Sequence, residues 1–151
     1  MSDEYSELES EFNNELKGYG SLSLELGGDL AESESAHIGY HIRPEDIEAL
    51  YFEGIGIPRW ESIEAETNEK RVEIYNESMA KIMADYPLIQ RVSDTDVKVA
   101  YTPEEIPALQ TECQRVMETT SDAKATKALQ KFVIACRKAA AHQTGLRLSP
   151  V

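Results

Sequence analysis

The sequence predicts an α+β fold in which a small, mostly antiparallel sheet is covered by about four to five helices within a single domain. Three observations favour this fold. The chain has 151 residues, a length at which one core withdraws about 68–70% of the unfolded surface from water. Short segments alternate apolar and polar residues, which is typical of strands with one buried face. Longer segments repeat apolar residues at intervals of three and four, which is typical of amphipathic helices.

An acidic segment over residues 1–36 is expected to precede an α+β core over residues 37–151. A first helix is predicted by apolar residues at helical spacing, namely Tyr5, Leu8, Phe12 and Leu16. Residues 22–26 then alternate leucine with polar residues, and residues 37–42 alternate isoleucine and tyrosine with histidine and glycine. Both patterns predict strands, and we expect the two strands to pair as a hairpin with a long loop.

The middle of the chain predicts a short helix and then a long one. The short helix opens at Pro44 and continues to about Phe52, before the glycines and proline of residues 54–58 break the chain. The long helix is expected from Trp60 to Ala84, because Tyr86-Pro87 just beyond would end it. Its apolar side would consist of Ile63, Val72, Tyr75, Met79, Ile82 and Met83.

The last third of the chain predicts a strand, two helices and a closing strand. Val97, Val99 and Tyr101 alternate, and Thr102 with Pro103 and Glu105 forms the pattern of a capped helix start. This helix would bury Ile106, Leu109, Cys113, Val116 and Met117. A further helix over residues 122–143 would bury Ala125, Leu129, Phe132, Val133, Cys136 and Ala140, and Leu146 and Leu148 would form the closing strand.

The two cysteines lie on these apolar stripes. A free cysteine in such a position behaves as a small buried hydrophobe. We therefore expect Cys113 and Cys136 to be buried thiols rather than a disulfide or a reactive site, which fits the reducing cytoplasm. The acidic start and the lack of a long apolar run predict a cytoplasmic protein without a membrane span or a secretory signal.

Negative charge is concentrated in the first half of the chain. Residues 1–78 hold 20 acidic and 5 basic side chains, a net charge of −15, whereas residues 79–151 hold 8 and 10, a net charge of +2. Basic residues of the last helix include Lys124, Lys127 and Lys131. Such an asymmetry repels nucleic acid and anionic membranes and attracts basic partners.

Two segments share one pattern. Residues 44–50 and residues 103–109 are identical at five positions, and each follows an alternating apolar run. The pattern indicates either an internal duplication or two helices that begin by the same rules. Together with the alanine-rich residues 138–141 and the closing residues 145–148, it resembles small bacterial YfbM-like proteins and is similar to immunity proteins of polymorphic toxin systems. The resemblance covers residues 37–148 and implies a binding protein without enzymatic activity.

Two motifs could carry chemistry. His37, His41 and Glu45 lie four residues apart, a spacing that could place zinc ligands on one face, although the alternation of this segment favours histidines that face solvent. Gly54-Ile55-Gly56 lacks the third glycine and the lysine of a phosphate loop and favours a turn. No nucleophile and base stand at a motif-like spacing, so the sequence predicts no catalytic residue, no metal and no cofactor.

Acidic loop residues and aromatic residues beside the glycine break provide the candidate binding surface. Tyr51, Phe52 and Trp60 could anchor a contact or belong to the core. We expect an acidic protein that binds a basic protein partner, such as an immunity protein or antitoxin that masks an effector enzyme. The alternative is a small-molecule or regulatory domain with a pocket between sheet and helices. The candidate partner-binding residues are Glu25, Asp29, Glu32, Glu34, Tyr51, Phe52 and Trp60.

Overall fold

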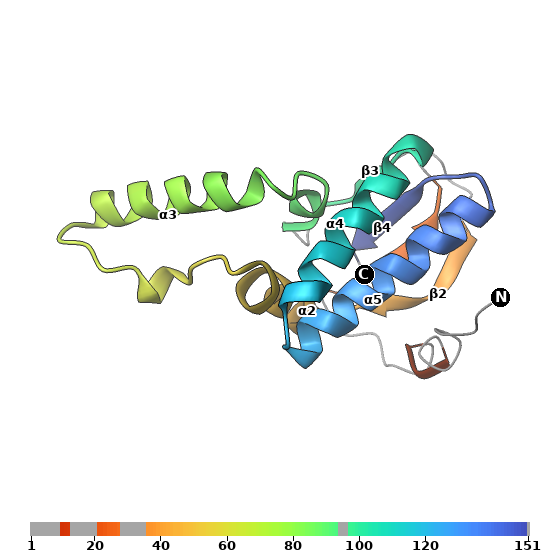
Figure 1. Cartoon of the computed structure of the whole chain (residues 1–151), viewed down its shortest axis with the longest axis horizontal. Coiled ribbons are helices and arrows are strands. Elements are labelled where there is room, and N and C mark those ends of the chain that lie inside the picture. Colours follow the sequence, from red (N-terminus) through yellow and green to blue (C-terminus); the bar gives the residue numbers. More distant parts are fainter. Residues whose placement is uncertain (1–9, 13–20, 28–35, 94–96, 151) are drawn as a thin grey trace.

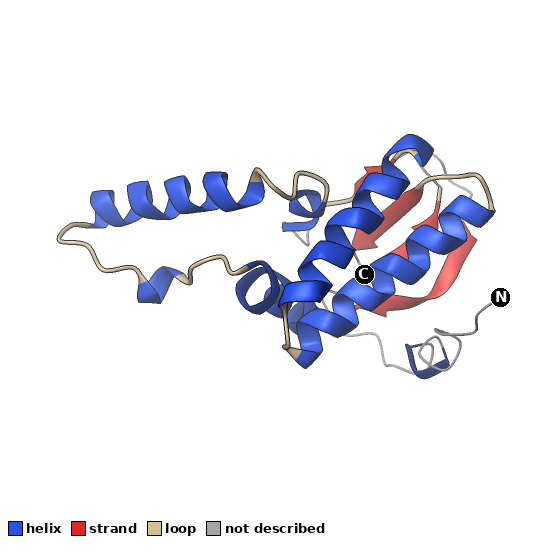
Figure 2. Ribbon diagram, in the orientation of Figure 1, coloured by secondary structure: helices blue, strands red, loops and turns tan. Residues whose placement is uncertain are grey.

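The computed structural model describes residues 10–12, 21–27, 36–93 and 97–150, and it confirms the α+β fold (Figures 1 and 2). The strands are β1 (Leu22–Leu26), β2 (Ala36–Ile42), β3 (Val99–Tyr101) and β4 (Leu146–Pro150). The α-helices are α2 (Pro44–Ala49), α3 (Asn68–Met83), α4 (Ile106–Thr119) and α5 (Ala123–Ala141). A π-helix, η1 (Leu50–Ile55), continues α2, and three 3-10 helices are η2 (Trp60–Ser62), η3 (Ile89–Ser93) and η4 (Pro103–Glu105).

The four strands form one antiparallel sheet in the order β2-β1-β4-β3. The predicted hairpin is confirmed, because Leu22 of β1 stands opposite Ile42 of β2. Of the first expected helix, only residues 10–12 are described. They are helical, and Phe12 is buried. Within the ranges given above, every helix is too short or too polar to cross a lipid bilayer.

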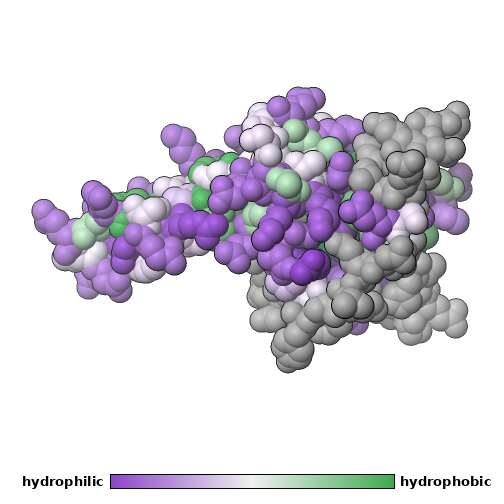
Figure 3. Space-filling model, turned by 90° about the horizontal axis from the view of Figure 1, so that it is seen from below, coloured by the Kyte–Doolittle hydropathy of each residue, from purple (hydrophilic) through white to green (hydrophobic). Residues whose placement is uncertain are grey.

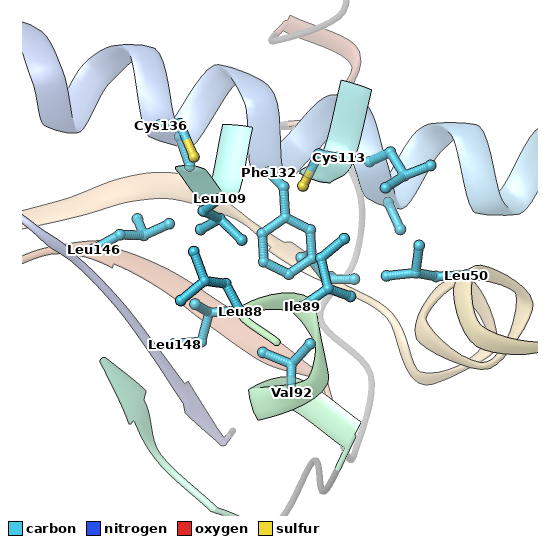
Figure 4. Packing of buried hydrophobic residues seen from close by; sticks show 14 of the residues in the cluster. Leu50, Leu88, Ile89, Val92, Leu109, Cys113, Phe132, Cys136, Leu146 and Leu148 are labelled. Atoms are coloured by element: carbon cyan, nitrogen blue, oxygen red, sulfur yellow. The ribbon is translucent and has the colours of Figure 1, made fainter. Parts of the chain in front are cut away.

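The core lies between the sheet and the pair α4 and α5, which run across one face of it (Figures 1 and 4). Leu146 and Leu148 of β4 meet Leu109 of α4 and Phe132 of α5 in one buried cluster. Both cysteines are buried and free, as predicted. Burial raises the pKa of the Cys136 thiol to about 12 and that of Cys113 well above its usual range, so both thiols are protonated at neutral pH.

The expected long helix does not begin at Trp60. A 3-10 turn forms at Trp60–Ser62, the backbone is extended at Ile63, and α3 starts only after Thr67, whose side chain accepts a hydrogen bond from the Lys70 amide at 3.1 Å. Trp60 packs edge-on against Tyr75, with ring centroids 5.7 Å apart. In a continuous helix these two residues would lie about 22 Å apart along the axis. The chain therefore folds back, and this tertiary contact overrides the local helical preference.

The folded-back segment and α3 form an arm, residues 58–83, that extends away from the body of the molecule (Figures 1 and 2). Of the 16 residues of α3 only Met83 is buried, and Val72 is 40% exposed. The predicted apolar side of this helix therefore joins the core only near its C-terminal end, where Met83 is buried in the core and Met79 and Ile82 pack against it. The Arg115 guanidinium holds the segment that follows the arm, since it donates to the Asp85 carbonyl at 2.6 Å and lies 4.9 Å from the centre of the Tyr86 ring.

A buried polar network fixes Leu88 and Ile89, where the chain returns from the arm to the core. The carboxylate of Glu112 on α4 accepts hydrogen bonds from the amides of Leu88 at 3.1 Å and Ile89 at 3.0 Å. The Tyr101 hydroxyl donates to the Leu88 carbonyl at 2.6 Å, and the Tyr51 hydroxyl donates to the Ile89 carbonyl at 2.5 Å. Burial raises the pKa of both phenols, which keeps them protonated as donors. The backbone of this segment thus enters the core without losing hydrogen bonds.

The predicted helix start at Thr102 is confirmed as a capping box. Glu105 accepts from the Thr102 amide at 2.9 Å and pairs with both terminal nitrogens of the Arg91 guanidinium. The hydrogen bond from Arg91, followed by that from Thr102, lowers the pKa of Glu105 from 4.5 to about 2. The ionised carboxylate therefore stabilises the fold at neutral pH.

Replacing Glu105 by glutamine keeps an acceptor for the Thr102 amide but removes the ion pair with Arg91, so it should lower the free energy of unfolding at pH 7 by up to about 1 kcal/mol. Because the pKa of Glu105 is depressed in the folded state, its contribution is complete above about 4.5 and disappears as the pH falls toward about 2. Melting temperatures of the variant and the parent should therefore converge over this interval. Glu104→Gln, a change at the exposed neighbour, is the control. A difference that stays constant down to pH 2 would show that the ionised form is not what stabilises this helix start.

Candidate functional site

An apolar pocket lies where the arm joins the body. Its volume is about 320 Å³, and apart from Glu48 its lining consists of apolar and aromatic side chains and one proline. The helical turns of α2 and η1 provide most of the lining, and α3 and Ile57, just after η1, provide the rest. The lining residues of this junction pocket are Pro44, Ile47, Glu48, Tyr51, Phe52, Ile57, Tyr75 and Met79.

An acidic hollow adjoins the junction pocket, since Glu48 lines both. The hollow has a volume of about 540 Å³ and collects residues from α2, η1, the start of the arm and the start of α5. Four carboxylates face two cationic side chains there, so the local charge is negative. The lining residues are Glu45, Glu48, Ala49, Glu53, Arg59, Asp122, Ala123 and Lys124.

Arg59 connects the start of the arm to η1. Its guanidinium donates to Glu48 at 3.3 Å and to Glu53 at 3.2 Å, and it lies 4.3 Å from the centre of the Phe52 ring. Both hydrogen bonds raise the pKa of Arg59, and the bond to Glu53 has the larger effect. One cation thus shares two carboxylates and an aromatic face, a combination that suits planar guanidinium groups in general.

Aromatic and cationic contacts also hold the two limbs of the arm together. The Arg71 guanidinium lies 5.0 Å from the centre of the Trp60 ring, and its Nε donates to the Ile63 carbonyl at 3.0 Å. Trp60 remains 36% exposed although it contacts Tyr75. Apolar side chains therefore reach the surface of the arm among polar ones (Figure 3). Exposed aromatic surface next to a pocket is typical of interaction sites.

The structure brings the three candidate aromatic residues to the junction but gives them different surroundings. Tyr51 is buried, and its ring lines the pocket while its hydroxyl bonds to the core. Phe52 is half-buried beneath Arg59, and Trp60 is exposed on the arm. Phe52 and Trp60 are thus available to a partner, whereas Tyr51 is mainly structural.

Of the four acidic residues proposed to bind a partner, the structure describes only Glu25. Glu25 does not belong to an exposed loop: it lies in β1, is buried, and accepts from the Ser149 hydroxyl at 2.7 Å and from Arg147 Nε at 3.3 Å. The register of β1 and β4 places Glu25 opposite Arg147, so its charge is used inside the sheet. The other three, Asp29, Glu32 and Glu34, lie outside the described residues.

Sequence reasoning did not identify the carboxylates of the acidic hollow or the role of α3 in the pocket. Tyr75 and Met79 were expected on the apolar side of the long helix. Both are half-buried and line the pocket, and Met79 also packs against the core. Glu45 and Glu48 are three residues apart at the start of a helix that buries Ile47, so their shared outer face was readable from the spacing. The pairing of Glu48 with Arg59 depends on the turn that the chain makes at Gly56 after η1, and it could not be read from the spacing.

The remaining sequence motifs serve packing. His41 is buried in β2, so the expectation that it faces solvent is wrong, and Glu45 forms an ion pair with Arg43. Among the described residues, no group of three or more histidine, cysteine, aspartate or glutamate side chains is arranged to hold a metal. Gly54 lies within η1 rather than in a turn. A Cβ there would approach Val116 Cγ1 to 3.2 Å, and the turn itself is made by Gly56 at φ +91°.

Lys131 of the last helix is buried rather than exposed to solvent. Its side chain is fully buried, its Nζ donates to the His41 carbonyl at 2.7 Å, and it lies 5.0 Å from the centre of the Phe12 ring. Lys124 is exposed and Lys127 is half-buried. The basic residues of this helix therefore do not form one continuous patch.

Comparison with known proteins identifies no relative. No protein-family model matches the chain, and searches of curated proteins and of solved structures find no match either.

Proposed function

We propose that this chain is a protein-interaction protein that binds a basic partner protein at the junction of arm and body. The observation that carries the proposal is the adjacency of an apolar pocket and an acidic hollow beside an exposed, projecting arm. Apolar pockets at the centre of an interface provide most of the affinity. Surrounding charges mainly provide speed of association and specificity.

The charge of the chain supports this choice of partner. Residues 1–78, which include α2, η1 and nearly all of the arm, carry a net charge of −15. A field of this sign accelerates encounters with basic proteins and opposes those with nucleic acids. The partner is therefore expected to be basic over the surface that meets the arm.

An immunity protein or antitoxin that masks an effector enzyme is the most concrete form of the proposal. Enzymes that act on nucleic acids present a positive active-site surface, which an acidic protein can cover. The resemblance of residues 37–148 to YfbM-like and immunity proteins supports this form, and it assigns no catalytic role to the chain. An effector encoded next to this gene would be the first partner to test.

The association rate constant with the purified partner should fall at least about tenfold between low and high salt, because electrostatic steering is screened by ions. The partner is first isolated by affinity capture on the full chain and then purified separately. Stopped-flow fluorescence gives the rate constants over a series of ionic strengths. A partner without a basic surface, or a rate constant that does not depend on salt, would contradict the proposal.

The junction pocket also favours a second candidate function, the binding of an apolar small molecule. Its volume of about 320 Å³ lies at the lower end of the range of ligand pockets, about 300–1,000 Å³. The pocket lies between the arm and α2–η1, not between the sheet and the helices as expected from the sequence. Screening small molecules for an increase in melting temperature distinguishes this function from protein binding.

A further inference from the structure

We infer that the junction pocket receives one large apolar side chain of the partner, presented on a segment in which arginine or lysine residues flank it. This inference rests on the proposed function and specifies what is recognised. Three features of the junction lead to it: the composition of the pocket, the charge around it, and the way the chain holds its own Arg59.

The pocket is suited to a single apolar side chain. Its volume is small, and Glu48 is the one charged residue in its lining. Phe52, Tyr75 and Met79 are each half-buried, so they keep apolar surface in contact with water that a bound side chain would cover. Burying such surface is favourable by about 25 cal/mol per Å². The unbranched Met79 side chain can also adjust to the shape of the group that enters.

The surroundings of the pocket select basic neighbours for that side chain. The acidic hollow shares Glu48 with the pocket and adds Glu45, Glu53 and Asp122. A segment with acidic flanks would place like charges together, which costs affinity, whereas basic flanks complement the hollow. The charge of the acidic hollow therefore distinguishes basic from acidic partner segments, which the apolar pocket alone could not distinguish.

The contacts of Arg59 show which cation fits here. Its guanidinium lies between the carboxylates of Glu48 and Glu53 and over the Phe52 ring. Carboxylates and an aromatic face are the usual surroundings of a bound arginine. The hollow adds Glu45 and Asp122 to the two carboxylates that Arg59 binds, so an arginine of the partner would meet further carboxylates next to the apolar pocket.

Fluorescent peptides test the inference directly. The first peptide has one phenylalanine with two arginines on each side. The second replaces the phenylalanine by alanine, and the third replaces the arginines by glutamates. Fluorescence anisotropy with the full chain should show that the first peptide binds at least about tenfold more tightly than the second or the third, a difference of about 1.4 kcal/mol. Equal binding of the three peptides, or no binding of the first up to millimolar concentration, would overturn the inference.

A pair of arm variants locates the binding. Met79→Lys places a cation in the lining of the pocket and should weaken binding of the first peptide at least about tenfold. Val72→Lys changes an exposed residue of the same helix that does not line the pocket, and it should leave binding within about twofold. Melting temperatures of both variants check that the fold is intact. Equal effects of the two changes would overturn the inference.

The two proposals can fail separately. If the whole partner binds Met79→Lys as tightly as the parent chain while its association still depends on salt, the pocket inference is overturned and the proposed function stands. If the partner shows no basic surface and no salt dependence, the proposed function fails. The peptide comparison then decides independently whether the pocket accepts a basic and apolar segment.

Discussion

Replacing Glu112 by alanine should lower the free energy of unfolding by about 3 kcal/mol, since this buried carboxylate binds the amides of Leu88 and Ile89. Removing it leaves two buried donors without their acceptor, and each unsatisfied group costs about 1–3 kcal/mol. The substitution therefore disrupts the point at which the arm returns to the core.

Two further variants give this experiment its controls. Glu118→Ala removes an exposed carboxylate from the same helix and should change stability by no more than about 0.5 kcal/mol. Glu112→Gln keeps an oxygen that can accept a hydrogen bond from one amide, so its free energy of unfolding should lie between those of the two alanine variants. Urea denaturation measures the free energy of unfolding of all three variants. Equal stability of the Glu112→Ala and Glu118→Ala variants would show that the carboxylate does not hold the segment.

Local patterns predicted most of the secondary structure because the forces that form it are local. The leucine alternation of residues 22–26 predicted β1, and the capping pattern from Thr102 to Glu105 predicted the start of the helical segment η4–α4. The start of α3 was predicted wrongly because it depends on a contact between Trp60 and Tyr75 that forms only when the chain folds back. Residues 60–67 have no strong signal against a helix.

Buried polar residues were the least predictable part of the fold. Glu112 stands between Leu109 and Cys113 on an apolar stripe, which was a sign of a buried carboxylate, but the amides that it binds could not be read from the sequence. Glu25 was predicted as a polar residue of the strand over residues 22–26 and as a candidate partner-binding acid, but it is buried. Its partner Arg147 lies 122 residues further along the chain, and only the register of the sheet brings the two together.

The candidate site was predictable only where its residues are close together along the chain. Phe52 and Trp60 flank a glycine break, and proximity along the chain was enough to nominate both. Glu48 and Glu53 acquire their role through Arg59, and Met79 through the course of the arm. The sequence shows that these residues are charged or apolar, whereas the arrangement that turns them into a pocket and a hollow is tertiary.

Reversing two charges on the arm should slow association with the basic partner at least about tenfold at low salt. The variant carries Glu61→Lys and Glu64→Lys, both at exposed positions on the limb that precedes α3. Neither lies in the core, so the melting temperature should be nearly unchanged. The effect on the rate should fade as salt is added, because ions screen the interaction between exposed charges.

The matched control carries Glu104→Lys and Glu118→Lys on the body of the molecule, where both positions are exposed. It raises the net charge by the same amount as the arm variant, so the two differ only in where the charge lies. The measurement is the association rate constant of each variant with the purified partner, by stopped-flow fluorescence, over a series of ionic strengths. If the partner binds at the arm and its junction, the arm variant is at least about tenfold slower at low salt and the control stays within about twofold of the parent. Equal slowing by both variants would contradict a binding site on the arm, because it would show that net charge alone determines the rate.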